Sequence, residues 1–302
     1  LRTPIGTYNG SLKDLKADQL GTAVINEILT KCNIAREDID EVIMGQVLTG
    51  GTGQNAARQA AINAGIPVSK PAYIVNQVCG SGLRAVIAGF QSIKLGDTNI
   101  VLSGGQENMS IASELILRKN KKDIFDKDTV NLMINDGLID SFNNYHMGIT
   151  AENIAKKYSI SRVEQDYFAL NSQKKTQIAI RDGCFEEETI EINLTGSFLI
   201  NDEHPRKNLT LADLQKLKTV FDKNGTVTPG NSSGINDGAA VLLLMNLEEA
   251  KKKSIKTLAR IVSWASVGVD PSLMGLGPIG AIKEAIKKAS WKIEDVDLFE
   301  IN

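Results

Sequence analysis

Short apolar segments alternate with helical segments in the first third of the chain. Buried strands are predicted at residues 41–45, 73–77 and 99–103, the last ending in Gly104 and Gly105, with helices between them at residues 55–64 and 82–95. Continuous apolar strands between helices are typical of a parallel sheet that is covered on both faces. This pattern places the chain in the α/β class.

The sequence pattern changes between residues 111 and 228, where charged runs such as residues 118–123 appear and strand patterns become sparse. Ser161 and Glu164 form a capping box that predicts a helix ending near Gly183, and Thr210 predicts another helix start. We therefore expect a polar, helix-rich insertion here. The sheet pattern returns at residues 239–245.

The chain also repeats itself, because residues 25–40 can be placed over residues 282–297 at one constant offset. The identical pairs are Ile25/Ile282, Glu27/Glu284, Lys31/Lys288, Glu37/Glu294, Asp38/Asp295 and Asp40/Asp297. In each copy an amphipathic helix leads through an acidic turn into a predicted strand. A chance match of two amphipathic helices is the alternative, but the shared turn at a fixed register favours duplication and two related halves.

The composition argues against several classes of protein. The 34 Lys and Arg against 36 Asp and Glu give a net charge of −2, which disfavours a surface built for nucleic acid or anionic membranes. The three cysteines, Cys32, Cys79 and Cys184, form no Cys-x-x-Cys pair and no cluster with histidine. A disulfide framework, a metal site and an oxidising compartment are therefore not expected. The longest apolar run, residues 239–245, is too short to cross a bilayer.

A glycine-rich segment between a predicted strand and helix matches the relaxed dinucleotide fingerprint at Gly51, Gly53 and Ala56. The match is weak, because the acidic residue expected about 20 positions further on is absent. A tight glycine turn is the better interpretation.

Cys79 gives the sharpest local signal, since it lies where a predicted strand ends and a helix begins. Gly80 and Gly82 remove side chains around it and permit unusual backbone angles, and the helix directs its free N–H groups and positive dipole end toward the sulfur, favouring the thiolate. Simple packing is the alternative and suits Cys32, on the apolar face of its helix. For Cys79 we favour a nucleophile. A histidine before a helix, such as His146, is more often a cap or surface residue than a ligand, and residues 231–238 fit a simple loop. Spacing alone indicates a site at neither.

Taken together, these motifs resemble the thiolase family, and within it the biosynthetic, short-chain thiolases. The matching stretches are residues 2–6, 76–82, 104–110, 146–152, 225–234 and 275–278. The resemblance implies an α/β fold of duplicated βαβαβαββ halves with an inserted helix-rich loop domain. On this basis residues 1–110, continued by 229–250, form the first half, residues 111–228 the inserted loop domain, and residues 251–302 the incomplete start of the second half.

The same resemblance implies catalytic roles. It makes Cys79 the acylated nucleophile and matches Asn302 to the asparagine that orders an oxyanion-hole water. The family's first strand would precede Arg2, and its catalytic histidine and second cysteine would follow Asn302. We therefore expect the chain to be part of a longer one, active at full length and inactive as the segment given.

Five further residues acquire binding roles from the resemblance. His146 and Ser233 line the pantetheine tunnel, Arg206 lies near the nucleotide end of CoA, and Met274 lies near the acyl pocket. Met147 after His146 is typical of the short-chain members.

The function implied is condensation of two acetyl-CoA molecules to acetoacetyl-CoA and CoA, with the reverse thiolysis, through an acetyl group on Cys79. A longer-chain 3-ketoacyl-CoA thiolase and a non-catalytic, CoA-binding thiolase-like subunit are the alternatives. No metal or organic cofactor, no nucleic acid and no membrane partner is expected. The protein is expected to form a homo-oligomer, either a dimer or a tetramer. The expected location is cytoplasmic, with a mitochondrial one left open.

Overall fold

The computed structural model describes residues 1–120 and 123–302, with side chains outside residues 118–127. Its contacts divide the chain into two units. The first contains residues 1–137, 176–206 and 234–257, and the second residues 138–175, 207–233 and 258–302. These two units are defined by contacts within the structure. The division of the chain at residues 110, 228 and 250 was based on the two halves of the family's fold, and it stays a prediction.

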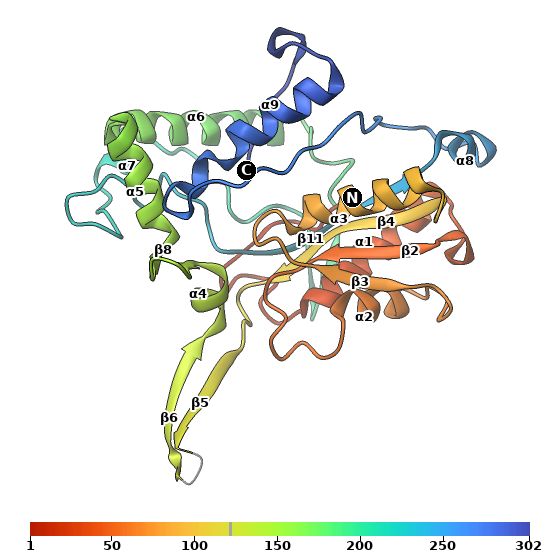
Figure 1. Cartoon of the computed structure of the whole chain (residues 1–302), viewed down its shortest axis with the longest axis horizontal. Helices are drawn as coiled ribbons and strands as arrows, with labels where there is room; N and C mark the ends of the chain where they lie inside the picture. The colour runs from red at the N-terminus through yellow and green to blue at the C-terminus, as the bar shows by residue number, and fades with distance from the viewer. Residues whose placement is uncertain (121–122) are drawn as a thin grey trace. The chain divides into compact units, whose positions relative to one another are not determined.

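The first unit is built on a five-stranded sheet with the order β1-β11-β4-β2-β3 (Figure 1). Its strands are β1 (Gly6–Thr7), β2 (Glu41–Gly45), β3 (Ala72–Val75), β4 (Ile100–Asn108) and β11 (Asn236–Met245). β2 pairs in parallel with both β3 and β4, which confirms the predicted parallel arrangement, while β11 runs antiparallel to β4.

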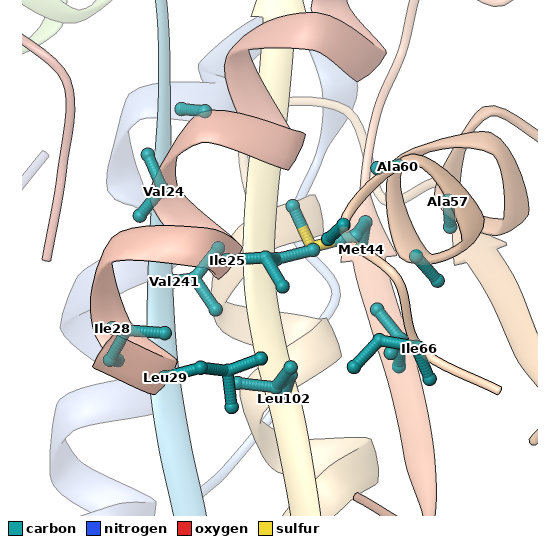
Figure 2. Packing of buried hydrophobic residues seen from close by; sticks show 14 of the residues in the cluster. Val24, Ile25, Ile28, Leu29, Met44, Ala57, Ala60, Ile66, Leu102 and Val241 are labelled. Atoms are coloured by element: carbon teal, nitrogen blue, oxygen red, sulfur yellow. The ribbon is translucent and has the colours of Figure 1, made fainter. Parts of the chain in front are cut away.

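Helices cover both faces of this sheet. Side chains alternate between the two faces along each strand, so neighbouring residues of one strand contact different helices. Met44 of β2 and Leu102 of β4 join the cluster under α1 (Ala17–Cys32) and α2 (Ala56–Asn63). Figure 2 shows Val24, Ile25, Ile28 and Leu29 of α1 directed into this cluster. The intervening residues Ile43 and Val101 join Ala85 of α3 (Ser81–Leu95) in a second cluster.

Strand β4 does not end at Gly104 and Gly105 as predicted, but continues to Asn108. A Cβ added to Gly104 would overlap the carbonyl oxygen of Ala240 and come within 2.8 Å of the Cα of Val241. Gly104 therefore allows β11 to approach closely, and neither glycine interrupts the ladder.

The expectation of few strands between residues 111 and 228 was wrong, although the helices are present. In the first unit this stretch holds the hairpin of β5 (Glu114–Asn120) and β6 (Asp123–Asn131), then α4 (Leu132–Gly137), and a second hairpin of β9 (Ile192–Leu194) and β10 (Ser197–Leu199). Of the charged run at residues 118–123, residues 118–120 end β5 and residue 123 begins β6, while residues 121–122 lie outside the described part. Charge there hid the strand pattern.

The second unit is mainly helical. It contains the short pair β7 (Ile139–Asp140) and β8 (Tyr145–His146), then α5 (Met147–Tyr158), most of α6 (Arg162–Arg181), α7 (Leu211–Gln215), the 3-10 helix η2 (Pro271–Leu276) and α9 (Gly277–Ala289). Both predicted helix starts are confirmed. The Ser161 N–H donates to Glu164 Oε2 at 2.7 Å, and Thr210 and Asp213 form a reciprocal capping box.

The internal repeat extends to the backbone. Helix α1 ends at Asn33 in the left-handed conformation, with φ 51°, and a 3-10 turn (Arg36–Asp38) follows. Helix α9 ends in the same way at Ser290, with φ 59°, before the turn Ile293–Asp295. The strand expected next in the second copy is not formed, because within the described ranges no neighbouring strand pairs with residues 297–302.

Within residues 1–120 and 123–302, none of the helices combines the length and the apolar character that crossing a lipid bilayer requires.

Candidate active site

Cys79 lies on the short connection between β3 and α3, as the sequence predicted, and its side chain is exposed. Helix α3 begins at the next position but one, with Gly80 as its N-cap and no side chain capping it. The thiol therefore lies beside the positive end of a 15-residue helix. Cys184 is also exposed, whereas Cys32 is half-buried against the core under α1.

The turn that presents Cys79 is strained at the preceding residue. Val78 has φ 48°, in the left-handed region that a β-branched side chain disfavours by about 1–2 kcal/mol. Its N–H donates to Asn76 Oδ1 at 2.9 Å, and its carbonyl accepts from the Ser81 hydroxyl at 2.6 Å and from the Ser81 N–H at 3.0 Å. These bonds hold the unfavourable conformation in place.

The role predicted for Gly80 and Gly82, which was to supply unusual backbone angles, was wrong. Neither has a positive φ; that conformation falls on Val78. Gly45 is needed for close packing instead, because a Cβ added there would overlap the first turn of α3. A Cβ added to Gly82 would lie 3.9 Å from Gly104 and Gly105, which is an ordinary contact. The glycine at the end of β2 thus lets the helix start approach that strand closely.

The segment that resembled a dinucleotide fingerprint is a glycine turn. Gly51 has φ 77° and Gly53 has φ 86°, and the Asn55 side chain caps α2 by accepting from the Arg58 N–H at 3.1 Å. This confirms the interpretation as a tight turn.

In the second unit, His146 caps helix α5. Its Nδ1 accepts a hydrogen bond from the Gly148 N–H at 3.0 Å, which assigns the ring proton to Nε2 in the neutral form. The imidazole stacks on Phe221, with ring centroids 4.4 Å apart and planes inclined by 21°. Burial lowers the pKa of His146, and protonation of Nδ1 would also break the cap. His146 is thus held as a neutral donor at Nε2.

Helix α5 also anchors the glycine-rich loop that ends at Ser233. The carboxylate of Glu152 accepts from the Thr226 N–H at 2.8 Å, from the Thr226 hydroxyl at 2.8 Å and from the Val227 N–H at 2.7 Å. One side chain therefore fixes the beginning of this loop.

Helix α6 anchors the far part of the same loop. Asp166 is fully buried and accepts from Arg162 Nε at 2.8 Å and from Asn231 Nδ2 at 3.1 Å. The other amide atom, Asn231 Oδ1, accepts from the Thr228 N–H at 2.8 Å. Ser233, two residues further on, is exposed beyond this anchored segment.

The predicted binding residues are distributed over both units. Within the second unit, His146 and Met147 start α5, which packs against η2, the helix that carries Met274. Asn302 belongs to this unit and is exposed. Arg206 is exposed in the first unit, as is Cys79.

Over the described ranges, no group of three or more His, Cys, Asp or Glu side chains is arranged to hold a metal ion. The absence of a metal or organic cofactor stays a prediction.

The sequence matches the family described as "Thiolase, N-terminal domain" over residues 1–248, and "Thiolase, C-terminal domain" over residues 255–302. The chain belongs to the thiolase family. Its fold is the thiolase fold: a crystal structure of the Bacillus anthracis acetyl-CoA acetyltransferase matches with a TM-score of 0.94 at 37% identity, covering 99% of this chain and 77% of that one.

Relatives of this thiolase include the cytosolic acetyl-CoA acetyltransferase of Mus musculus, 48% identical over 307 aligned positions. The acetyl-CoA acetyltransferase of Shinella zoogloeoides is 48% identical over 305 positions. Each alignment covers 100% of this chain, and 77% and 78% of the relative, respectively.

Four residues that hold predicted site residues or their segments in place were missed from the sequence: Ser81, Glu152, Asp166 and Phe221. Ser81 and Glu152 lie inside the quoted motifs, so the motifs were a usable signal for them. Asp166 and Phe221 carried no signal, because their partners Asn231 and His146 are 65 and 75 positions away.

Proposed function

We propose that this thiolase condenses two acetyl-CoA molecules to acetoacetyl-CoA and CoA, and catalyses the reverse thiolysis, through an acetyl group carried on Cys79. The observation that carries the proposal is the exposed thiol of Cys79, held on a strained turn beside the N-terminus of α3. Identity of 48% to two acetyl-CoA acetyltransferases, over 100% of this chain, supports the substrate assignment.

In the first half-reaction the Cys79 thiolate attacks the carbonyl carbon of acetyl-CoA. A new C–S bond forms, the bond to the CoA sulfur breaks, and the departing CoA thiolate takes up a proton. The α3 dipole favours the attacking thiolate, and N–H groups near Cys79 are candidates to stabilise the oxyanion.

In the second half-reaction a base removes a methyl proton from a second acetyl-CoA. The carbanion attacks the carbonyl of acetyl-Cys79, a C–C bond forms, and the Cys79 thiolate leaves. The family resemblance assigns the base to a cysteine, and assigns Asn302 to the water of the oxyanion hole. The two half-reactions imply ping-pong kinetics.

We assign CoA and acyl binding to five residues on the family resemblance: His146, Met147, Arg206, Ser233 and Met274. The anchored loop before Ser233 and the neutral, capped His146 support this assignment, since Glu152 and Asp166 hold the loop and the Gly148 N–H holds the imidazole. We also propose a homo-oligomer, checked by light scattering, and no metal or organic cofactor. A cytoplasmic location, with a mitochondrial one open, is kept as an expectation.

Mapping the acyl adduct tests the nucleophile. The protein carrying this chain is incubated with acetyl-CoA, digested, and analysed by mass spectrometry. We expect acetyl on Cys79 and none on Cys184, although both thiols are exposed, because only Cys79 precedes a helix N-terminus. Cys79→Ser should abolish both directions of the reaction. Acetyl on Cys32 or Cys184 with Cys79 unmodified would contradict the assignment.

Chain-length preference separates this function from that of a longer-chain 3-ketoacyl-CoA thiolase. We expect kcat/KM for acetoacetyl-CoA to exceed that for a long 3-ketoacyl-CoA. A preference of about tenfold for the long substrate, or about 1.4 kcal/mol of transition-state stabilisation, would show that the short-chain assignment is wrong.

Arg206 is tested with a substrate that lacks the nucleotide. Arg206→Ala should raise KM for acetyl-CoA but leave KM for an acetyl-pantetheine thioester unchanged. Arg181→Ala, on an exposed side chain paired with Asp182, is the matched control. Equal losses on both substrates would place Arg206 away from the nucleotide.

A further inference from the structure

Ser81 makes contacts that helix formation does not require. Its hydroxyl accepts from the Gln77 N–H at 2.9 Å and donates to the Val78 carbonyl at 2.6 Å, while its own N–H donates to the same carbonyl at 3.0 Å. The side chain is buried. Ser81 therefore closes the turn around the strained residue Val78, and Cys79 lies inside the loop that these bonds close.

The backbone of Ser81 is itself fixed. A Cβ added to Gly45 would overlap the Ser81 carbonyl carbon, so the end of β2 lies directly against this residue. On the other side, the Cα of Gly82 lies against Gly105 of β4. The hydroxyl thus connects the strand-to-helix turn to a point held between two strands.

We propose that Ser81 is a positioning residue for the nucleophile: its hydroxyl holds Val78 at positive φ and thereby fixes the direction in which Cys79 presents its thiol. Without it, the Gln77 N–H loses the acceptor it has here and Val78 can relax toward the negative φ that a β-branched residue prefers. The inference rests on Cys79 being the nucleophile of the proposed function.

The first test is Ser81→Ala, with Ser103→Ala as the matched control. Ser103 is also a buried serine, in β4, and its hydroxyl has no partner, so its loss should leave the turn unchanged. We expect Ser81→Ala to slow the single-turnover acetylation of Cys79 by about tenfold while KM stays within about twofold. The ratio of the iodoacetamide alkylation rate of Cys79 to that of exposed Cys184, the internal reference, should change as well.

The second test uses Val78→Asn, because asparagine tolerates the left-handed conformation. In that background Ser81→Ala should slow acetylation by less than about threefold, since the turn no longer depends on the hydroxyl. This pair also covers the case in which Ser81→Ala alone folds poorly. An equal loss in both backgrounds, or a Ser81→Ala rate equal to that of Ser103→Ala, would overturn the proposal.

The outcome is distinguishable from a failure of the proposed function. If the unsubstituted protein forms no acetyl-Cys79 but Ser81→Ala still changes the alkylation ratio of Cys79 to Cys184, the function is wrong and the positioning role stands. If acetylation proceeds and neither readout responds to Ser81→Ala, the positioning role is wrong.

Discussion

The ring of Phe221 occupies the space where a Cβ at position 148 would lie. Gly148 is the second residue of α5, so the glycine lets the ring reach His146 and stack on it at 4.4 Å. A residue without a side chain thus determines how a proposed substrate-binding imidazole is held. Glycine is needed here because it leaves space for the ring, although alanine would favour the helix more strongly.

Gly148→Ala should destabilise the protein by up to about 2 kcal/mol. Overpacking costs about 1–3 kcal/mol, and about 1 kcal/mol of helix propensity offsets part of it. Urea unfolding measures the change. Gly268→Ala is the control, since nothing lies within 4 Å of its added Cβ and its φ is not positive; it should stay within about 0.5 kcal/mol. Equal stability of the two variants would contradict the contact with Phe221.

Two helices hold one loop in the second unit. Helix α5 contributes Glu152, whose carboxylate accepts three hydrogen bonds from Thr226 and Val227, and helix α6 contributes the buried Asp166, which accepts from Asn231. A loop of this kind would be mobile without such partners, because glycine and serine give it little of its own to pack. The elements therefore supply the rigidity that the loop sequence lacks.

Asp166→Asn should lower the free energy of unfolding by about 2 kcal/mol. Removing one charge from a buried pair typically costs about 3–5 kcal/mol, but Arg162 is 23% exposed and water will compensate part of the loss. The control is Asp182→Asn, in which the same change is made at an exposed pair with Arg181, and it should have almost no effect.

Asp166→Asn should also raise KM for acetyl-CoA if the loop presents Ser233 to the substrate. A stability loss without any change of KM would separate the structural role of Asp166 from the proposed binding role of the loop.

Over the whole molecule, both histidines favour the neutral form in the folded state. Burial lowers the pKa of His146 below its ordinary value of 6.5, and burial followed by the charge of Arg206 lowers that of His204. The unfolded chain therefore binds protons first as pH falls. The stability from these groups is complete above pH 6.5 and is lost as pH falls through the lower folded pKa.

Thermal unfolding between pH 8 and pH 3 should therefore show two declines of Tm. The first begins near pH 6.5. The second begins near pH 4.5, because hydrogen bonds from Ser161 and Thr210 lower the pKa of Glu164 and Asp213, whose stabilisation is lost on protonation. His146→Asn should reduce the first decline, since asparagine caps the helix without titrating. An unchanged first decline would exclude His146 as its source.

Short-range features were predictable from the sequence because they depend on residues within a few positions of one another. The capping boxes at Ser161 and Thr210, the strand at residues 41–45, the repeated helix and turn, and the place of Cys79 between strand and helix are of this kind. The motifs were also sufficient for the family, since they keep their order along the chain.

Long-range features were decided only by the tertiary structure. Gly104 could not be read as part of a strand until β11 lay against it, and the charged hairpin at residues 114–131 gave no clean alternation. The positive φ of Val78 is held by Ser81, whose backbone is fixed by Gly45 from another strand. The sequence thus determined that a reactive cysteine begins a helix, while packing between distant segments decided the backbone conformation in which its thiol is presented. That conformation is unfavourable for valine, so the backbone preference of residue 78 does not predict it.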